Sequence, residues 1–210
     1  MIENPIEYLK SKKIKKDSQY LGKLYRAIRE KYGEMKFDVD IFEKYSTKIR
    51  NRNQFKPNVI NEIGKMFTFS YRPLNYDTLP YYDMQPLIFS LNIPSSEEVF
   101  GINLHYLPLH YRFATYQMLV QFATDPTRKA NTRIRLLYDY MKNKKQFIPS
   151  LVSIRQYKTK RIRSMVYEID PKYWEHAIII PTQLFIKKNE KTVYMNTSRE
   201  IRKKLGENNG

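Results

Sequence analysis

Five cationic side chains within nine residues form the densest cluster of candidate binding groups in this chain. They are Arg155, Lys158, Lys160, Arg161 and Arg163, with the aromatic residue Tyr157 between them. Cationic groups of this kind bind phosphate oxygens, and an aromatic ring beside them can stack on a base. The same region also contains Lys142, Lys144 and Lys145. We therefore predict that these nine residues bind DNA, although a solvated basic loop without a ligand has a similar composition.

A second cationic run, Arg199, Arg202, Lys203 and Lys204, lies close to the C-terminus. The segment from Ser198 begins with a helical pattern and ends in polar residues. Chain ends of this composition are commonly frayed, so we expect a solvated tail rather than a binding site.

Two carboxylates suggest metal-dependent hydrolysis as another chemistry. Asp77 and Asp83 flank Tyr81 and Tyr82, and paired carboxylates can bind Mg²⁺ for phosphodiester cleavage. No third acid lies nearby in the sequence to complete a nuclease motif. An Asx-type turn at Asp77, with Pro80 and the tyrosines packed onto the fold, is therefore the favoured interpretation.

The three histidines give only a weak indication of a metal site. His105 and His110 flank Leu107 and Pro108 at a predicted strand-to-helix junction, which does not put the two rings on one face. His176 lies far away in the sequence. The chain also contains no phosphate-binding glycine loop, dinucleotide fingerprint, zinc-protease helix or nucleophile elbow. We therefore expect no enzyme activity, no metal and no cofactor.

The distribution of charge supports a polyanionic partner. The chain of 210 residues has a formal net charge of +17, with 41% apolar and 14% aromatic residues. Residues 1–65 contain 16 Lys and Arg against 9 Asp and Glu, residues 66–141 contain 6 of each, and residues 142–210 contain 16 against 6. A neutral centre with basic flanks is typical of nucleic-acid binders, which gain affinity by releasing counterions from phosphates. A high lysine content that serves solubility alone is the alternative.

The absence of cysteine and the lengths of the apolar runs indicate where in the cell the protein is found. The chain has no cysteine, which argues against a disulfide scaffold and fits a reducing cytosol or a virion assembled there. We expect neither secretion nor membrane insertion, because no apolar run has the length of a signal peptide or a membrane span.

The elements that must position these groups fall into two predicted units. Residues 1–65 are predicted to form a basic helical N-terminal extension, with an N-cap at Asp17-Ser18, a stop at Gly33 and a capping box of Asp40 and Glu43. Residues 66–210 are predicted to form a β-barrel-like core with a helical hairpin and a basic C-terminal segment.

The barrel prediction comes from period-two patterns in the centre of the chain. Alternation at 67–71 and 100–106, and a short apolar run at 86–93, predict three strands around a long loop at 73–85. The fold class is therefore α+β, a small SH3-like β-barrel or strongly curved meander decorated by helices. Further short strands are expected at 151–154 and 165–169.

Helical patterns return after residue 108. A helix carrying Phe113, Tyr116, Val120 and Ala123 and a second helix up to Met141 predict the hairpin. Asp170-Pro171 predicts the start of a brief helix that contains Trp174 and Ala177.

The central segment also carries a family resemblance. The stretches FTFSY (67–71), DTLPYYD (77–83), QPLI (85–88) and GINLHYLP (101–108) resemble the DNA end protector family of T4-like tailed bacteriophages. A looser similarity follows in TRIRL (132–136) and PKYWE (171–175). The resemblance implies a virion head or packaging protein that shields the termini of the packaged genome from host exonuclease. It supplies no catalytic residues.

Together these observations predict a phage virion protein that binds double-stranded DNA ends and blocks exonucleases sterically. Its expected partners are DNA ends and head, neck or other virion proteins, with no membrane. Its expected location is the virion, and the host cytoplasm during assembly. The alternative is an assembly protein of the head–tail junction or baseplate, whose basic surface meets acidic virion subunits. A small metal-dependent nuclease is the third class.

Overall fold

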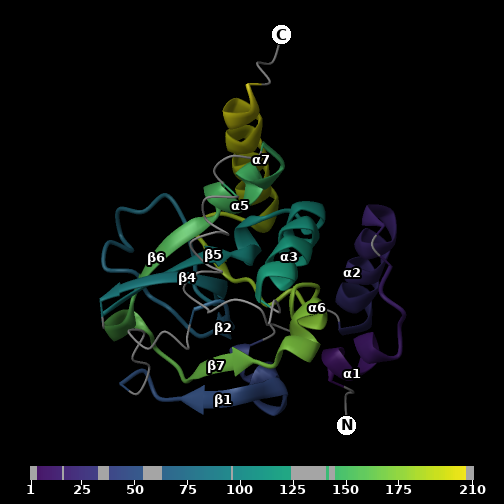
Figure 1. The fold of residues 1–210 in the computed structure, drawn as a ribbon, viewed down its shortest axis with the longest axis horizontal. Helices are drawn as coiled ribbons and strands as arrows, with labels where there is room; N and C mark the ends of the chain where they lie inside the picture. Colours follow the sequence, from purple (N-terminus) through teal and green to yellow (C-terminus); the bar gives the residue numbers. More distant parts are fainter. Residues whose placement is uncertain are drawn as a thin grey trace.

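A six-stranded antiparallel sheet forms the centre of the computed structural model, which describes residues 4–15, 17–32, 38–53, 63–95, 97–123, 141 and 145–206. The strand order is β1-β7-β2-β4-β5-β6 (Figure 1). These strands are β1 (Ser46–Arg50), β2 (Met66–Thr68), β4 (Leu87–Ser95), β5 (Glu98–Asn103), β6 (Ile154–Lys158) and β7 (Val166–Ile169). A separate pair consists of β3 (Tyr82–Asp83) and β8 (Phe185–Ile186).

Helices supply the rest of the described structure. The α-helices are α1 (Pro5–Lys10), α2 (Ser18–Tyr32), α3 (Leu109–Ala123), α5 (Ile148–Val152), α6 (Trp174–Ala177) and α7 (Glu190–Leu205). The 3₁₀ turns are η1 (Val39–Tyr45), η3 (Leu104–Tyr106), η4 (Lys145–Phe147), η5 (Thr159–Arg161) and η6 (Pro171–Tyr173). No helix within the described ranges is long and apolar enough to cross a membrane.

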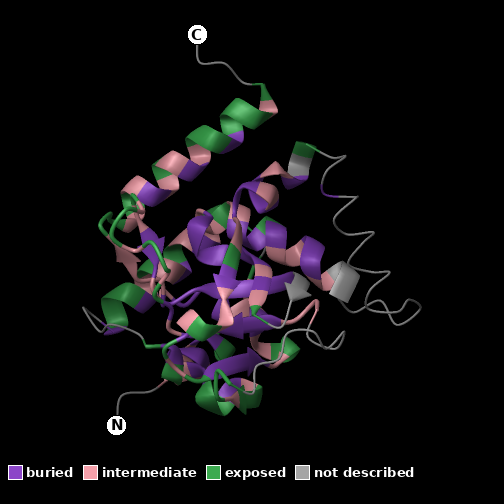
Figure 2. Ribbon diagram, turned by 90° about the vertical axis from the view of Figure 1, so that its left-hand side faces the viewer, coloured by how far each residue is buried: buried purple, intermediate pink, exposed green. Residues whose placement is uncertain are grey.

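The sheet buries both of its faces because apolar residues continue on both sides of its central strands. Met66 and Phe89 point into the main core, which they share with residues of α1, α2, η1, α3 and α6. Phe67 and Ile88, their neighbours in sequence, point into a second core on the opposite face. Figure 2 shows buried residues along these strands and exposed ones on the outer helices. The second core consists of Phe67, Phe69, Tyr71, Ile88, Val99, Tyr157, Ile162 and Val166.

The α+β class is confirmed, whereas an SH3-like barrel is not. The described strands form an open order with β1 and β6 at the two edges. This order differs from a simple meander because β7 lies between β1 and β2 and pairs with both. The connection from β6 to β7 therefore has to pass the intervening strands. It does so across the second core, where Ile162 pairs with Tyr71 in an isolated bridge.

Several local predictions need correction. The strand predicted at 151–154 is the end of α5 followed by the start of β6. The N-cap of η1 is Asp38, whose carboxylate accepts from the backbone N–H of Val39, so Asp40 is not the cap. Asp170 caps η6 as predicted, and α6 contains Trp174 and Ala177.

Two predictions concern the larger organisation. Residues 124–140 and Gly33 lie outside the described residues, so the second helix of the hairpin and the stop at Gly33 stay predictions. The boundary at residue 65 also stays a prediction. The described residues on both sides of it contribute to the main core, and β1 adds a strand to the segment expected to be helical.

Candidate nucleic-acid interface

The connection between β6 and β7 holds most of the predicted cationic cluster in a defined position. Ile162 is buried in the second core, and its neighbours Lys160 and Arg163 are exposed. The backbone N–H of Arg163 donates to the carbonyl of Ser70 over 2.8 Å. One inward apolar side chain and a backbone hydrogen bond thus anchor a segment whose cations face outward.

Two further segments bring cations to this connection. A guanidinium nitrogen of Arg52 donates to the carbonyl of Ile162 over 3.3 Å. Arg161 Nε donates to the carbonyl of Arg72 over 3.2 Å, and the backbone N–H of Arg72 donates to the carbonyl of Arg161 over 3.2 Å. We refer to Arg52, Arg72, Lys160, Arg161 and Arg163 as the β6–β7 basic patch.

Nearby carboxylates offset little of the positive charge of the basic patch. Lys160 approaches Glu97 at 3.6 Å, and Lys158 beside the patch approaches Glu98 at 3.9 Å. Exposed pairs of this length contribute little, because water screens them. Within the described part of the chain, no carboxylate forms an ion pair with Arg52, Arg72 or Arg163. No carboxylate among the described residues therefore offsets the positive charge of these three side chains.

Arg155 is not part of this patch. One guanidinium nitrogen donates to the carbonyls of Val152 and Ile154 over 2.9 and 2.8 Å. The guanidinium carbon lies 4.2 Å from the centre of the Tyr106 ring. Arg155 therefore holds the start of β6 against the turn that follows β5, through one guanidinium nitrogen and its contact with the Tyr106 ring.

Tyr157 cannot stack on a base in this conformation. Only 4% of the residue is exposed, and its ring packs edge-on against Phe69 and Tyr71 at centroid distances of 5.6 and 5.0 Å. Its hydroxyl accepts from Asn103 Nδ2 over 2.9 Å, and burial raises its pKa well above the usual value. The alternation along β6 directs this ring into the second core, so the predicted stacking role is wrong for this conformation.

Of the three lysines predicted to bind DNA before α5, the structure places Lys145 alone. Lys142 and Lys144 lie outside the described residues. Lys145 is exposed in η4, which leads directly into α5, and α5 contacts α7. This lysine is therefore associated with the helical end of the molecule.

Asp77 and Asp83 do not form a metal pair. Asp77 is exposed, whereas Asp83 is buried and its carboxylate accepts from the backbone N–H groups of Gln85 and Leu184 over 3.0 and 3.2 Å. Asn103 Nδ2 also donates to this carboxylate over 3.1 Å. Among the described residues, no group of three or more His, Asp or Glu side chains could hold a metal ion.

A Thr–His–Asp arrangement surrounds the same carboxylate. His105 Nδ1 lies 2.9 Å from Asp83 Oδ2, and Thr182 Oγ1 lies 3.3 Å from His105 Nε2. The order resembles that of a hydrolase triad, but all three residues are buried. A substrate has no access to the hydroxyl, so we interpret the arrangement as structural. His110 is exposed on α3 and takes no part in it.

Burial determines the charges in this arrangement. It lowers the pKa of His105, and the neighbouring Asp83 only partly offsets this effect. Burial opposes ionisation of Asp83, but the adjacent imidazole and the N–H donors hold its pKa below the usual range. At neutral pH, a neutral imidazole therefore donates from Nδ1 to an ionised carboxylate and accepts from Thr182 at Nε2.

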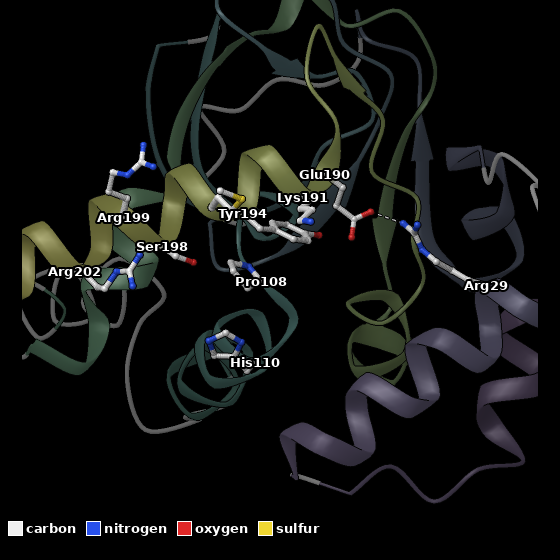
Figure 3. A pocket seen from close by; sticks show the side chains of 10 residues that line it. Arg29, Pro108, His110, Glu190, Lys191, Tyr194, Ser198, Arg199 and Arg202 are labelled. Atoms are coloured by element: carbon white, nitrogen blue, oxygen red, sulfur yellow. Dashed lines mark hydrogen bonds and ion pairs between the residues drawn. The ribbon is translucent and has the colours of Figure 1, made fainter. Parts of the chain in front are cut away.

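A second basic feature, predicted from the sequence to be a solvated tail, lies along α7. Figure 3 shows a groove between α7, the start of α3 and Arg29 of α2. Its volume is about 590 Å³. The helix begins at an N-cap, Asn189, that accepts from the N–H of Thr192, and this signal was available in the sequence. The groove is lined by Arg29, Pro108, His110, Glu190, Lys191, Tyr194, Met195, Ser198, Arg199 and Arg202.

One end of the α7 groove is held by a polar network. Glu190 pairs with Arg29 and accepts from Tyr25 over 2.9 Å and from Gln183 over 2.9 Å. Burial opposes its ionisation, but these donors lower its pKa. Arg112, fully buried in α3, donates to the hydroxyl of Tyr194 over 2.7 Å. The charge of Glu190 is therefore already used within the protein.

Comparison with known proteins identifies the family. A model of the phage T4 terminal DNA protecting protein matches residues 11–202. The chain belongs to this family. The match covers the β6–β7 basic patch, the buried Asp83 network and the α7 groove. Neither the curated proteins nor the solved structures contain a match to the chain.

Membership of a terminal DNA protecting family confirms the resemblance noted in the central segment. The motifs that carry it now have a structural explanation. Asp83, Asn103 and His105 form the buried network, and Phe69 and Tyr71 pack in the second core. The recognisable sequence thus belongs to the scaffold, while the exposed cations lie on the segments beside it.

Proposed function

We propose that this protein binds the ends of double-stranded phage DNA through the β6–β7 basic patch and protects them from exonucleases without catalysis. The observation that carries this proposal is the convergence of Arg52, Arg72 and Arg163 from three separate segments without a carboxylate partner in the described chain. Membership of the terminal DNA protecting family supports DNA ends as the ligand.

In this proposal the patch binds the phosphates of the last base pairs. Each phosphate that a cation neutralises releases counterions, so binding weakens steeply as salt increases. Contacts of this type position the protein on the duplex but do not read its sequence. A protein that must protect any terminus needs this lack of sequence preference.

Recognition of an end needs a group that contacts the exposed face of the terminal base pair. Leu74 is suited to this role because it is 59% exposed, only two residues from Arg72. Its loop is fixed by hydrogen bonds from Arg161 to the carbonyl of Pro73 over 3.1 Å and from Lys187 to the carbonyl of Leu79 over 3.0 Å. Apolar side chains can pack against base faces, and only an end offers such a face without unstacking.

Protection then follows from steric exclusion, because an exonuclease must engage the terminus that the protein covers. We propose that the protein enters the virion with the packaged DNA and acts in the infected host cell. Other virion proteins are its proposed protein partners.

The test compares a linear duplex of 60 base pairs with the same duplex closed by hairpins at both ends. We expect tighter binding to open ends at low salt and protection of those ends from a processive exonuclease. The variant R52E/R72E/R163E should lose both properties. The control K13E/K23E/K203E, which changes three exposed lysines elsewhere by the same charge, should keep both. Equal affinity for open and closed duplexes would refute end recognition, and the absence of binding to either duplex at low salt would favour an assembly role.

A further inference from the structure

The α7 groove combines a cationic rim with an apolar centre. Pro108, the ring of Tyr194 and Met195 supply apolar surface, and Met195 is 53% exposed. Exposed methionine is typical of surfaces that receive an apolar side chain of a partner, since its flexible thioether adapts to different shapes. Ser198 adds a hydroxyl next to this surface (Figure 3).

The charge of the groove is not balanced within the described chain. Arg29 is paired with Glu190, but Lys191, Arg199 and Arg202 form no ion pair with a described carboxylate. Lys191 and Arg202 lie eleven positions apart on one helix, which corresponds to about 16 Å along its axis. An extended chain advances roughly 3.3 Å per residue, so about five or six residues span this distance.

The shape of the groove favours a peptide over a DNA duplex. A duplex is a convex cylinder that presents phosphates and no projecting apolar groups. A concave groove of about 590 Å³ with methionine, proline and tyrosine on its walls matches an apolar side chain instead. Cations at both ends of the groove match carboxylates on either side of that side chain.

We propose that the α7 groove docks a short, extended, acidic segment of a partner protein that carries an apolar residue between its carboxylates. Such docking would attach the protein to another protein while leaving the β6–β7 basic patch available. It does not depend on the DNA-binding function, because different residues carry the two proposals.

The probe is a fluorescein-labelled hexapeptide of sequence EDLFDE, measured by fluorescence anisotropy up to 1 mM protein at low salt. Its controls are the uncharged peptide NQLFNQ, the acidic peptide without an apolar centre, EDGGDE, and a labelled hexathymidine strand. We expect EDLFDE to bind and all three controls to bind at least about fivefold more weakly.

Protein variants locate the site. K191Q/R202Q should weaken EDLFDE binding about five- to tenfold, and M195D should weaken it by a similar factor. The matched control is the double variant K203Q/K204Q, which removes two exposed charges from the same helix outside the groove. Thermal unfolding verifies that each variant is folded.

Three results would overturn the proposal. One is the absence of EDLFDE binding at 1 mM, and another is an equal loss in K203Q/K204Q and K191Q/R202Q. The third is tighter binding of hexathymidine than of EDLFDE with the same dependence on Lys191 and Arg202, which would assign the groove to nucleic acid. None of these results alters the expected binding of DNA ends to the β6–β7 basic patch.

Discussion

The imidazole Nδ1 of His105 lies 2.9 Å from Asp83 Oδ2, and both side chains are buried, with Thr182 Oγ1 3.3 Å from the other ring nitrogen. The two residues belong to different elements, so their contact fixes the turn after β5 against β3. Its stability depends on a neutral ring and an ionised carboxylate.

Lowering the pH from 7.5 to 5.5 should therefore destabilise the protein. The pKa of folded His105 is depressed by burial, whereas the unfolded residue titrates near 6.5, at about its ordinary value. The unfolded state binds the proton first, so stability is lost as the pH falls below about 6.5, at up to about 1.4 kcal/mol per unit for one site. Denaturant unfolding at several pH values measures this loss.

His110 and His176 also have pKa values lowered by burial, so their contributions must be separated. The dependence should persist in H110Q/H176Q. An NMR titration should show His105 binding its proton at a lower pH than an ordinary histidine, and a His105 ring that titrates at 6.5 or above contradicts the assignment.

Replacement of Asp83 by Asn should destabilise the protein by about 2–4 kcal/mol. The amide replaces one acceptor oxygen and leaves buried donors of Asn103 or His105 without a partner. Asp77 provides the matched control, because it is exposed and D77N should change stability by less than about 0.5 kcal/mol. Equal effects in the two variants would contradict this account. Both unfolding free energies come from urea titrations.

Tyr157→Phe should lower stability by about 1 kcal/mol and leave the affinity for DNA ends unchanged. The substitution removes the hydroxyl that accepts from Asn103 but keeps the ring packed against Phe69 and Tyr71. Thermal unfolding and gel shifts on the same preparations test both parts. A weaker gel shift with normal stability would show that the ring does reach DNA.

Gly101→Ala and Gly22→Ala should have opposite effects on stability. A Cβ at position 101 would lie 2.9 Å from the carbonyl oxygen of Phe89 on the neighbouring strand, so the sheet must shift to accept it. A Cβ at position 22, in the interior of α2, would have no atom within 4 Å, and alanine favours a helix by roughly 0.5–1 kcal/mol. Melting temperatures of the two variants should therefore move down and up, respectively.

Arg163→Gln should reduce the salt dependence of DNA binding. If this guanidinium neutralises one phosphate, the slope of log K against log salt falls by about one and the affinity declines for all sequences alike. Arg155→Gln is the contrast and should leave the slope unchanged, because the guanidinium of Arg155 is held against the carbonyls of Val152 and Ile154 and the Tyr106 ring. Binding isotherms measured from 50 to 200 mM salt give the slope for each variant, and equal slopes in the two variants would contradict the assignment of Arg163.

The central strands and the buried side of the fold could be predicted from the sequence because their patterns are local. The alternation at 67–71 predicted a strand, which the structure shows as the shorter β2 with an isolated bridge further on at Tyr71, and the apolar run from 86 predicted β4. The alternation at 100–106 extended too far. The side chain of Asn103 accepts from the N–H of His105 and begins η3 there.

The order of the strands in the sheet, and the set of exposed cations that form the β6–β7 basic patch, could not be predicted from local patterns. Edge strand β1 is largely exposed and polar, and its partner β7 is more than a hundred residues away in the chain. Tyr157 and Lys158 are neighbours in sequence, but the alternation of β6 buries the ring and leaves the lysine partly exposed. Arg52 and Arg72 joined the cationic cluster only through tertiary hydrogen bonds.

The place of β7 in the sheet has a consequence for synthesis of the protein. β7 lies between β1 and β2, so the ribosome must translate as far as residue 169 before the sheet can be continuous. Until then, the nascent chain exposes the edges of β1 and β2 that pair with β7 in the folded protein, and the apolar core that β7 helps to cover. A nonsense mutation upstream of residue 166 would leave a fragment with these open edges, prone to aggregation or proteolysis.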